Sequence, residues 1–126
     1  RCVAGCDIEV CRKITEIAIN GKRALLDRDW EELGNLMNEN HRIQDSISYS
    51  GDENNRLIRA ALEGGALGAK LAGAGGGGTI IALTLEPERT GEALLEAGAD
   101  MLLEPDPEVG GVTVDEIEDR KSFQEK

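Results

Sequence analysis

The sequence predicts an α+β domain built as a two-layer sandwich. Two observations lead to this class. Apolar residues recur with helical spacing through the first half of the chain, and two short runs typical of strands then flank a glycine-rich stretch. Another helical segment follows the second run, so helices come first and strands then interleave with a helix, an order typical of α+β folds.

Three helices are expected in the first half of the chain. Asp7–Leu26 is amphipathic, because its apolar positions recur at close to the helical period. A second helix should run from Trp30 to about Ile47, since Asp29 and Glu32 resemble a capping box at its start. After a polar loop, a third helix is expected over Glu53–Glu63, where a pair of glycines ends it.

The second half is expected to supply the strands and one more helix. Leu67–Ala72 and Thr79–Thr84 are the two expected strands, and the second of them is β-branched and apolar. Proline at the first helical position predicts a helix over Pro87–Ala97. Two short strands are expected at Asp100–Leu103 and Val112–Ile117.

Length and composition indicate one soluble domain. The chain has 126 residues, of which 40% are hydrophobic and only three aromatic, so its core depends on aliphatic side chains. Residues 1–117 are expected to form the domain, and residues 118–126 a frayed, charged tail. No apolar run approaches the roughly 20 residues of a membrane helix, and no secretory signal is visible, so a cytoplasmic location is expected.

The net charge of −11 argues against nucleic acid as a partner, because nucleic-acid binding depends on neutralising phosphates with Lys and Arg. It does not argue against ATP, which backbone N–H groups and a few local cations can hold whatever the global charge is.

The most informative segment is Gly73–Gly78, in which five of six residues are glycine. Glycine loses the most backbone freedom on ordering, so such a run is costly unless the backbone must approach something closely or adopt positive φ. Successive unobstructed N–H groups can form a concave nest for an anion. The run therefore indicates a phosphate-handling loop.

Several other interpretations of the run fail on context. Gly73, Gly75 and Gly78 match the dinucleotide-binding fingerprint, but a strand rather than a helix is expected after them. No Gly-Lys-Ser/Thr closes a Walker loop. The strand–glycine–strand arrangement is similar to the lid over ATP in protein kinases, but the V-A-I-K, H-R-D and D-F-G motifs of those kinases are missing. A hairpin tip without a ligand remains an alternative, although a tip needs only two or three turn residues.

Residues Ala66–Leu83, ALGAKLAGAGGGGTIIAL, resemble the third conserved motif of the GHMP kinases. The resemblance extends upstream through Leu33–Arg42 and the helix-like Asn54–Gly64. It implies a ferredoxin-like C-terminal domain in which the glycine loop packs beside the nucleotide phosphates. The ATP-binding loop and the catalytic residues of that family belong to an N-terminal domain. The chain, which starts at Arg1, is therefore expected to be one half of a kinase with no catalytic residue of its own.

The resemblance assigns the phosphate-binding positions residue by residue. They are Gly73, Ala74, Gly75, Gly76, Gly77 and Gly78. Lys70 and Thr79 are candidate contacts to phosphate or substrate, although strand alternation could equally direct Lys70 to solvent. Ala72 stands where many relatives carry threonine, and Thr79 where many carry cysteine, so a hydroxyl that could contact phosphate is missing before the run.

The function that the resemblance implies is transfer of the γ-phosphoryl group of ATP, with Mg²⁺, to a hydroxyl of a small molecule. A sugar, as in galactokinases and heptose kinases, is the first expectation for the acceptor, and a mevalonate-like alcohol is the alternative. A hypothesis of another class is a non-catalytic interaction domain, which would dock with a separate N-terminal half or form a homodimer.

Other chemically notable residues favour structural roles. Cys2, Cys6 and Cys11 lack the C-x2-C spacing common in zinc sites, so reduced thiols and no metal site are expected. His41 shares a predicted helical face with Asn38 and Arg42 and could touch a substrate, but a lone histidine near an apolar face is more often a structural residue.

Overall fold

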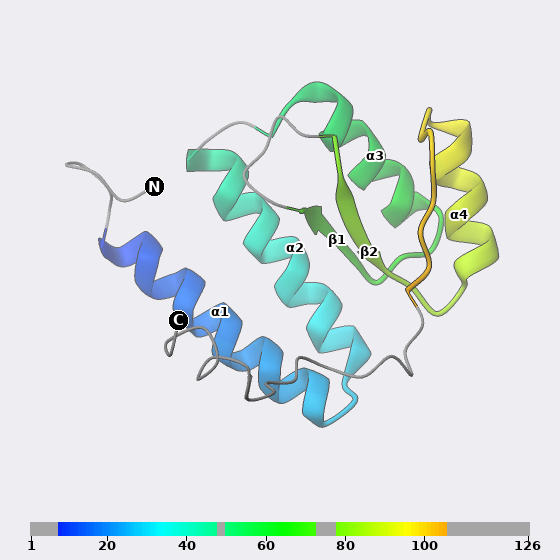
Figure 1. Ribbon diagram of the computed structural model, residues 1–126. Coiled ribbons are helices and arrows are strands. Elements are labelled where there is room, and N and C mark those ends of the chain that lie inside the picture. The colour runs from blue at the N-terminus through cyan, green and yellow to red at the C-terminus, as the bar shows by residue number, and fades with distance from the viewer. Residues whose placement is uncertain (1–7, 48–49, 73–77, 106–126) are drawn as a thin grey trace, which may run out of the picture.

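The computed structural model describes residues 8–47, 50–72 and 78–105, which form four helices and two strands (Figure 1). The elements in chain order are α1 (Ile8–Leu26), α2 (Trp30–Ile47), α3 (Asp52–Glu63), β1 (Gly68–Leu71), β2 (Ile80–Leu83) and α4 (Pro87–Glu96). The predicted α+β class is confirmed, and the predicted helices and first two strands lie within a residue or two of the observed ones.

The α2 helix begins as its capping sequence predicts. The backbone N–H of Glu32 donates to the Asp29 carboxylate at 3.2 Å, which satisfies one of the free donors of the first turn. In a capping box the N–H of Asp29 would donate to the Glu32 side chain. Here it donates to the carbonyl of Ala24 at 2.9 Å, so the turn from α1 satisfies this donor.

β1 and β2 pair antiparallel in the register Gly68–Leu83, Ala69–Ala82, Lys70–Ile81 and Leu71–Ile80. α3, with α4 beside it, covers one face of this sheet (Figure 1). α2 packs against β1 along the edge that does not pair with β2, and α1 packs against α2 (Figure 1). Ala69 of β1 belongs to the same buried cluster as Leu94 of α4, so alternate residues of the strand face these helices.

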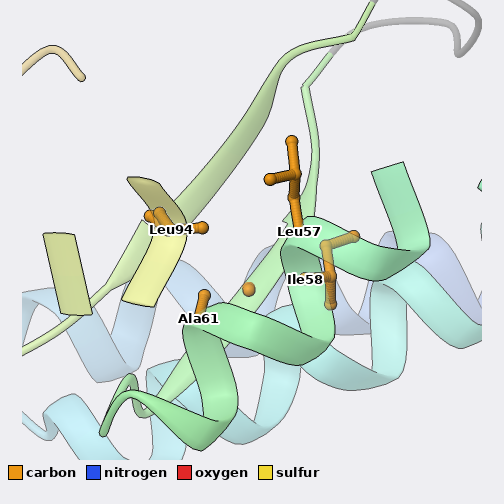
Figure 2. Close-up of a cluster of buried hydrophobic side chains, with 5 residues drawn as sticks. Leu57, Ile58, Ala61 and Leu94 are labelled. Atoms are coloured by element: carbon orange, nitrogen blue, oxygen red, sulfur yellow. The ribbon is translucent and has the colours of Figure 1, made fainter. Parts of the chain in front are cut away.

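Two apolar clusters hold these elements together. Leu57, Ile58 and Ala61 of α3 meet Leu94 of α4 and Ala69 of β1 in the larger cluster (Figure 2). The smaller cluster joins α1 to α2, and its buried members are Ile17, Ala24 and Leu36. The core is aliphatic, as the composition predicts.

One predicted strand is wrong. Residues 100–103 have no strand structure, and their apolar side chains, such as Met101 and Leu103, are largely exposed. A strand needs a neighbouring strand for its backbone hydrogen bonds, and the described residues provide none there. The predicted strand Val112–Ile117 and the predicted tail lie outside the described residues.

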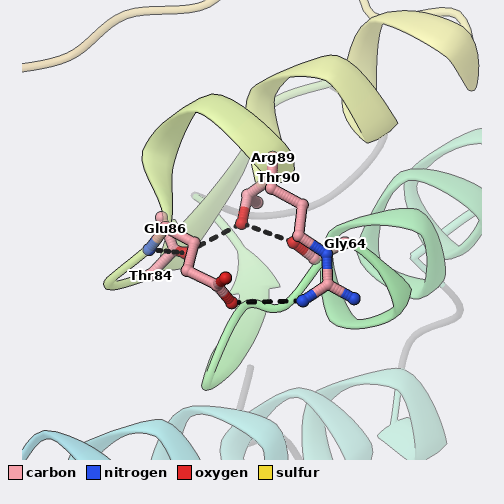
Figure 3. A network of polar contacts seen from close by, with 5 residues as sticks. All are labelled: Gly64, Thr84, Glu86, Arg89 and Thr90. Carbon is pink, nitrogen blue, oxygen red and sulfur yellow. Dashed lines mark hydrogen bonds and ion pairs between the residues drawn. The ribbon is translucent and has the colours of Figure 1, made fainter.

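A buried hydroxyl pair joins α4 to the end of α3 (Figure 3). The Thr90 hydroxyl donates to the Gly64 carbonyl at 2.9 Å and lies 2.8 Å from the Thr84 hydroxyl. Thr84 in turn accepts the N–H of Glu86 at 2.9 Å. Because the single proton of Thr90 goes to Gly64, Thr84 must donate to Thr90.

We expect Thr90→Val to lower the free energy of unfolding by about 1–2 kcal/mol, because the near-isosteric change leaves a buried carbonyl and a hydroxyl without their partners. Thr15→Val on the exposed surface of α1 removes a similar bond, to the carbonyl of Cys11, and should change stability by less than about 0.5 kcal/mol. Urea unfolding of both variants would measure the difference. Equal effects would show that the Thr90 hydroxyl contributes nothing specific.

Candidate functional site

The hairpin formed by β1 and β2 brings the two ends of the glycine run together. The N–H of Ala72 donates to the carbonyl of Thr79 at 3.0 Å, which extends the ladder one pair beyond the strands. The two strands predicted on either side of the glycine run are therefore neighbours in one sheet. The six residues between this bonded pair form the connection.

Of the predicted phosphate-binding positions, Gly78 is described, whereas Gly73, Ala74, Gly75, Gly76 and Gly77 lie outside the described residues. Gly78 is exposed and has φ +73°, a left-handed conformation that side-chain-bearing residues rarely adopt. A Cβ built there would meet no atom of the described residues within 4 Å. Glycine suits this position because of its backbone conformation and not because a described neighbour crowds it.

Lys70 and Thr79 lie at the same end of the hairpin. Lys70 is half-buried, and its ammonium donates to the carbonyl of Leu71 at 2.9 Å. It alternates with Ala69 and Leu71, so it lies on the sheet face that α3 does not cover. The Thr79 side chain is exposed. Lys70 is consequently the cation that a phosphate beside this end of the hairpin would meet within the described strands.

A groove of about 520 Å³ opens beside Gly78 and Thr79 and runs between β2, α3, α4 and residues 98–104. Its walls are polar and apolar in nearly equal measure, and Leu57, Ile80 and Leu94 supply part of the apolar lining. The charged residues that line it are all acidic: Glu53, Asp100 and Glu104. The described lining of the groove therefore offers no cation to a phosphate.

A polar network that the sequence analysis missed lies behind the β1 end of the site. Asp45 accepts hydrogen bonds from the N–H of Ser50 at 2.9 Å and the Asn55 amide at 3.4 Å. The single proton of the Ser50 hydroxyl is shared between Asp45 at 3.2 Å and Asn55 Oδ1 at 2.8 Å. The Ser50 N–H above all, and then the two side chains, hold the pKa of the Asp45 carboxyl below its ordinary value. The Asp45 carboxylate is therefore ionised at neutral pH.

His41 connects this network to the sheet. Its Nε2 lies 2.9 Å from Asn55 Oδ1, and its Nδ1 accepts the N–H of Leu71 at 3.4 Å. Arg42, predicted to share its face, is exposed and is not brought to the site. The sequence feature that could have identified this network is the spacing of Asn38, His41 and Asp45, which places three polar side chains on the inner face of an amphipathic helix.

The described residues contain no cluster of three or more His, Cys, Asp or Glu side chains able to hold a metal ion. The expectation of reduced thiols is wrong for Cys11, which is disulfide-bonded, and its partner lies outside the described residues. Three cysteines close together in sequence allowed such a bond, but spacing alone could not decide whether it forms. Among the described helices, none combines the length and apolarity needed to cross a bilayer.

Comparison with known proteins gives consistent matches. The family model described as GHMP kinases C terminal matches residues 22–102. The mevalonate kinase of Thermococcus gammatolerans is 39% identical over 92 residues, which cover 70% of this chain and 26% of that protein. The galactokinase of Enterococcus faecalis is 39% identical over 84 residues, covering 65% of this chain and 21% of that protein.

A solved structure agrees with these sequence matches. The crystal structure of L. major mevalonate kinase in complex with R-mevalonate superposes with a TM-score of 0.63 at 32% identity, covering 71% of this chain and 27% of that one. The chain spans about a quarter of the length of these relatives.

Proposed function

The chain belongs to the GHMP kinase family as its C-terminal domain, and from this premise we propose that it forms part of an ATP-dependent small-molecule kinase. The enzyme would transfer the γ-phosphoryl group of ATP to a hydroxyl of its substrate, acting in the cytoplasm. The observation that supports this role most directly is the hairpin, whose bonded Ala72–Thr79 pair closes a glycine-rich connection that begins at Lys70's end of β1.

For the acceptor, we propose mevalonate in preference to the sugar that the sequence analysis placed first. The support is the mevalonate kinases among the relatives, one of them solved with R-mevalonate. Galactose is the second candidate, because a galactokinase matches the chain at the same 39% identity as the first of those mevalonate kinases. The rest of the enzyme, including its catalytic groups, would come from a further domain.

The part of the mechanism that we assign to this chain is binding and orientation of the nucleotide phosphates. Phosphoryl transfer depends chiefly on positioning and on stabilising charge. The loop backbone would donate N–H groups, and Lys70 is the cation placed to meet a phosphate if its ammonium leaves the Leu71 carbonyl. The described residues do not offer a ligand cluster that fits Mg²⁺, so we derive no step through that ion.

The proposal is tested by turnover. The protein at its natural length should release ADP from Mg·ATP when mevalonate is added. ADP release with galactose alone would favour the second candidate, and no turnover with either would contradict the proposed function.

A matched pair of glycine variants tests the loop within the same assay. Gly78→Val forces a β-branched residue into a left-handed conformation that costs about 1–2 kcal/mol, so the loop should shift and the KM for ATP should rise about tenfold. Gly65→Val places a comparable strain at φ +96° beyond the end of α3, outside the groove, and should leave the KM for ATP unchanged. Equal KM values for the two variants would mean that Gly78 does not shape the ATP site.

A further inference from the structure

The free edge of β1 is covered by side chains of α2 in place of another strand. Asn38 accepts the N–H of Ala69 at 3.0 Å and donates to the carbonyl of Leu67 at 3.3 Å. One turn further along the helix, His41 accepts the N–H of Leu71. The N–H groups of Ala69 and Leu71 point away from β2 because alternate residues of an antiparallel strand direct their hydrogen bonds to opposite sides.

The bond to Leu71 fixes which ring nitrogen of His41 carries the proton. Nδ1 accepts a backbone N–H, so it must be bare, and the proton is on Nε2. Nε2–H then donates to Asn55 Oδ1 at 2.9 Å. The ring is 8% exposed, so no water can readily replace either partner.

Asn55 connects His41 to the start of α3 through further hydrogen bonds. Its Oδ1 also accepts the Ser50 hydroxyl at 2.8 Å, and its amide donates to Asp45. Ser50 is 1% exposed and is held to Asp45 through its own N–H. The position of the His41 ring is thus set by α2, by the connection to α3 and by the first turn of α3.

We propose that His41 is a positioning residue for the described ends of the hairpin, Leu71–Ala72 and Gly78–Thr79, from which the proposed phosphate-binding loop extends, an inference that rests on the proposed function. The glycine run begins two residues after Leu71, and glycines have no side chains with which to order themselves. The position of such a loop depends on what holds its ends. The Ala72–Thr79 bond closes the hairpin, and His41 fixes the incoming strand against the rest of the domain through the Leu71 amide.

Two polar substitutions separate the two bonds of His41. Asn places an amide oxygen near the position of Nδ1 and keeps an acceptor for Leu71, but it is too short to reach Asn55. Gln places an amide group near the position of Nε2 and keeps a donor for Asn55, but it leaves the Leu71 N–H without an acceptor. His41→Asn and His41→Gln therefore perturb the same buried position while differing in the bond that matters.

The experiment uses the isotope-labelled 126-residue chain and measures backbone relaxation of Leu71, Ala72, Gly78 and Thr79, at the two ends of the hairpin, without any ligand. We expect His41→Gln to increase the motion of these amides, whereas His41→Asn stays close to the wild type. Arg42→Ala, at the exposed neighbouring position, should change nothing. Equal behaviour of the Asn and Gln variants, whether both are mobile or both are ordered, would overturn the proposal.

Titration with Mg·ATP then links loop order to binding. If the wild type binds, His41→Gln should weaken the affinity roughly fivefold, the effect of one lost hydrogen bond, and His41→Asn should restore it. A wild type that binds no Mg·ATP counts against the proposed function of this chain, while the ligand-free relaxation still decides the role of His41. Unchanged affinity in His41→Gln, with a wild type that binds, would refute the positioning role.

Discussion

Gly68→Ala is expected to lower the free energy of unfolding by about 3 kcal/mol, at the upper end of overpacking effects. A Cβ at Gly68 would collide with the carbonyl oxygen of Gly34 and lie 2.6 Å from its Cα. Gly34 is required for the same reason, because a Cβ there would lie 2.5 Å from the carbonyl oxygen of Leu67. Both partners in this collision are backbone, which cannot rotate away as a side chain can.

The consequence extends to the candidate site. Asn38 can reach the edge of β1 only while α2 lies against this strand. An alanine that pushes the helix away should therefore break these bonds as well as the packing. We expect cross-peaks of Ala69 and Leu71 to shift more than those of α4 in an amide spectrum of the variant.

Gly21→Ala is the matched control for this prediction. Gly21 lies inside α1, where a Cβ would meet only a Leu33 methyl carbon at an ordinary 3.8 Å. Alanine is the better helix former by about 1 kcal/mol, so this variant should be more stable than the wild type. Urea unfolding would measure both changes. If the two substitutions shifted stability in the same direction, the close approach of α2 to β1 would be wrong.

Leu71→Ala is the second change with a large expected effect. Leu71 is 1% exposed and is the largest of the fully buried side chains in the described part of the chain. Truncation of a leucine in such a site removes buried methyl groups and leaves a cavity, so we expect a loss of about 3 kcal/mol. The same change at Leu85, which is 65% exposed, should cost less than about 0.5 kcal/mol.

Thermal or urea unfolding of the two leucine variants checks this prediction. The N–H of Leu71 donates to His41, and the loss of packing in the variant should weaken this bond. The amide of residue 71 should therefore lose more protection from hydrogen exchange than the amide of Ala69. A stability close to that of Leu85→Ala would mean that Leu71 is not buried in solution.

Much of the fold could be predicted because its signals are local. The spacing of apolar residues determines α1 and α2, and proline at the first position determines where α4 begins. Asp29 caps α2 because its carboxylate reaches an N–H three residues away. Local signals misled at 100–103, where a strand was predicted and none forms, since a strand forms only where another strand supplies its hydrogen bonds.

Part of the candidate site could likewise be predicted from the sequence, and part depends on tertiary packing. The glycine run can be recognised in the sequence, because glycine adopts positive φ and lets the backbone approach a ligand more readily than any other residue. The partners of that run were decided by tertiary structure. His41, Asn55 and Leu71 come from three elements that meet only when α2 and α3 pack around β1.

The sequence by itself therefore determined the class of the domain, its helices, the hairpin around the glycine run and the family resemblance, because these depend on short-range spacing and residue type. The tertiary structure alone decided that Gly34 and Gly68 must be glycines and that α2 covers the edge of β1. It also decided which nitrogen of His41 accepts a hydrogen bond. These features depend on distances between atoms far apart in the chain, which residue spacing does not encode.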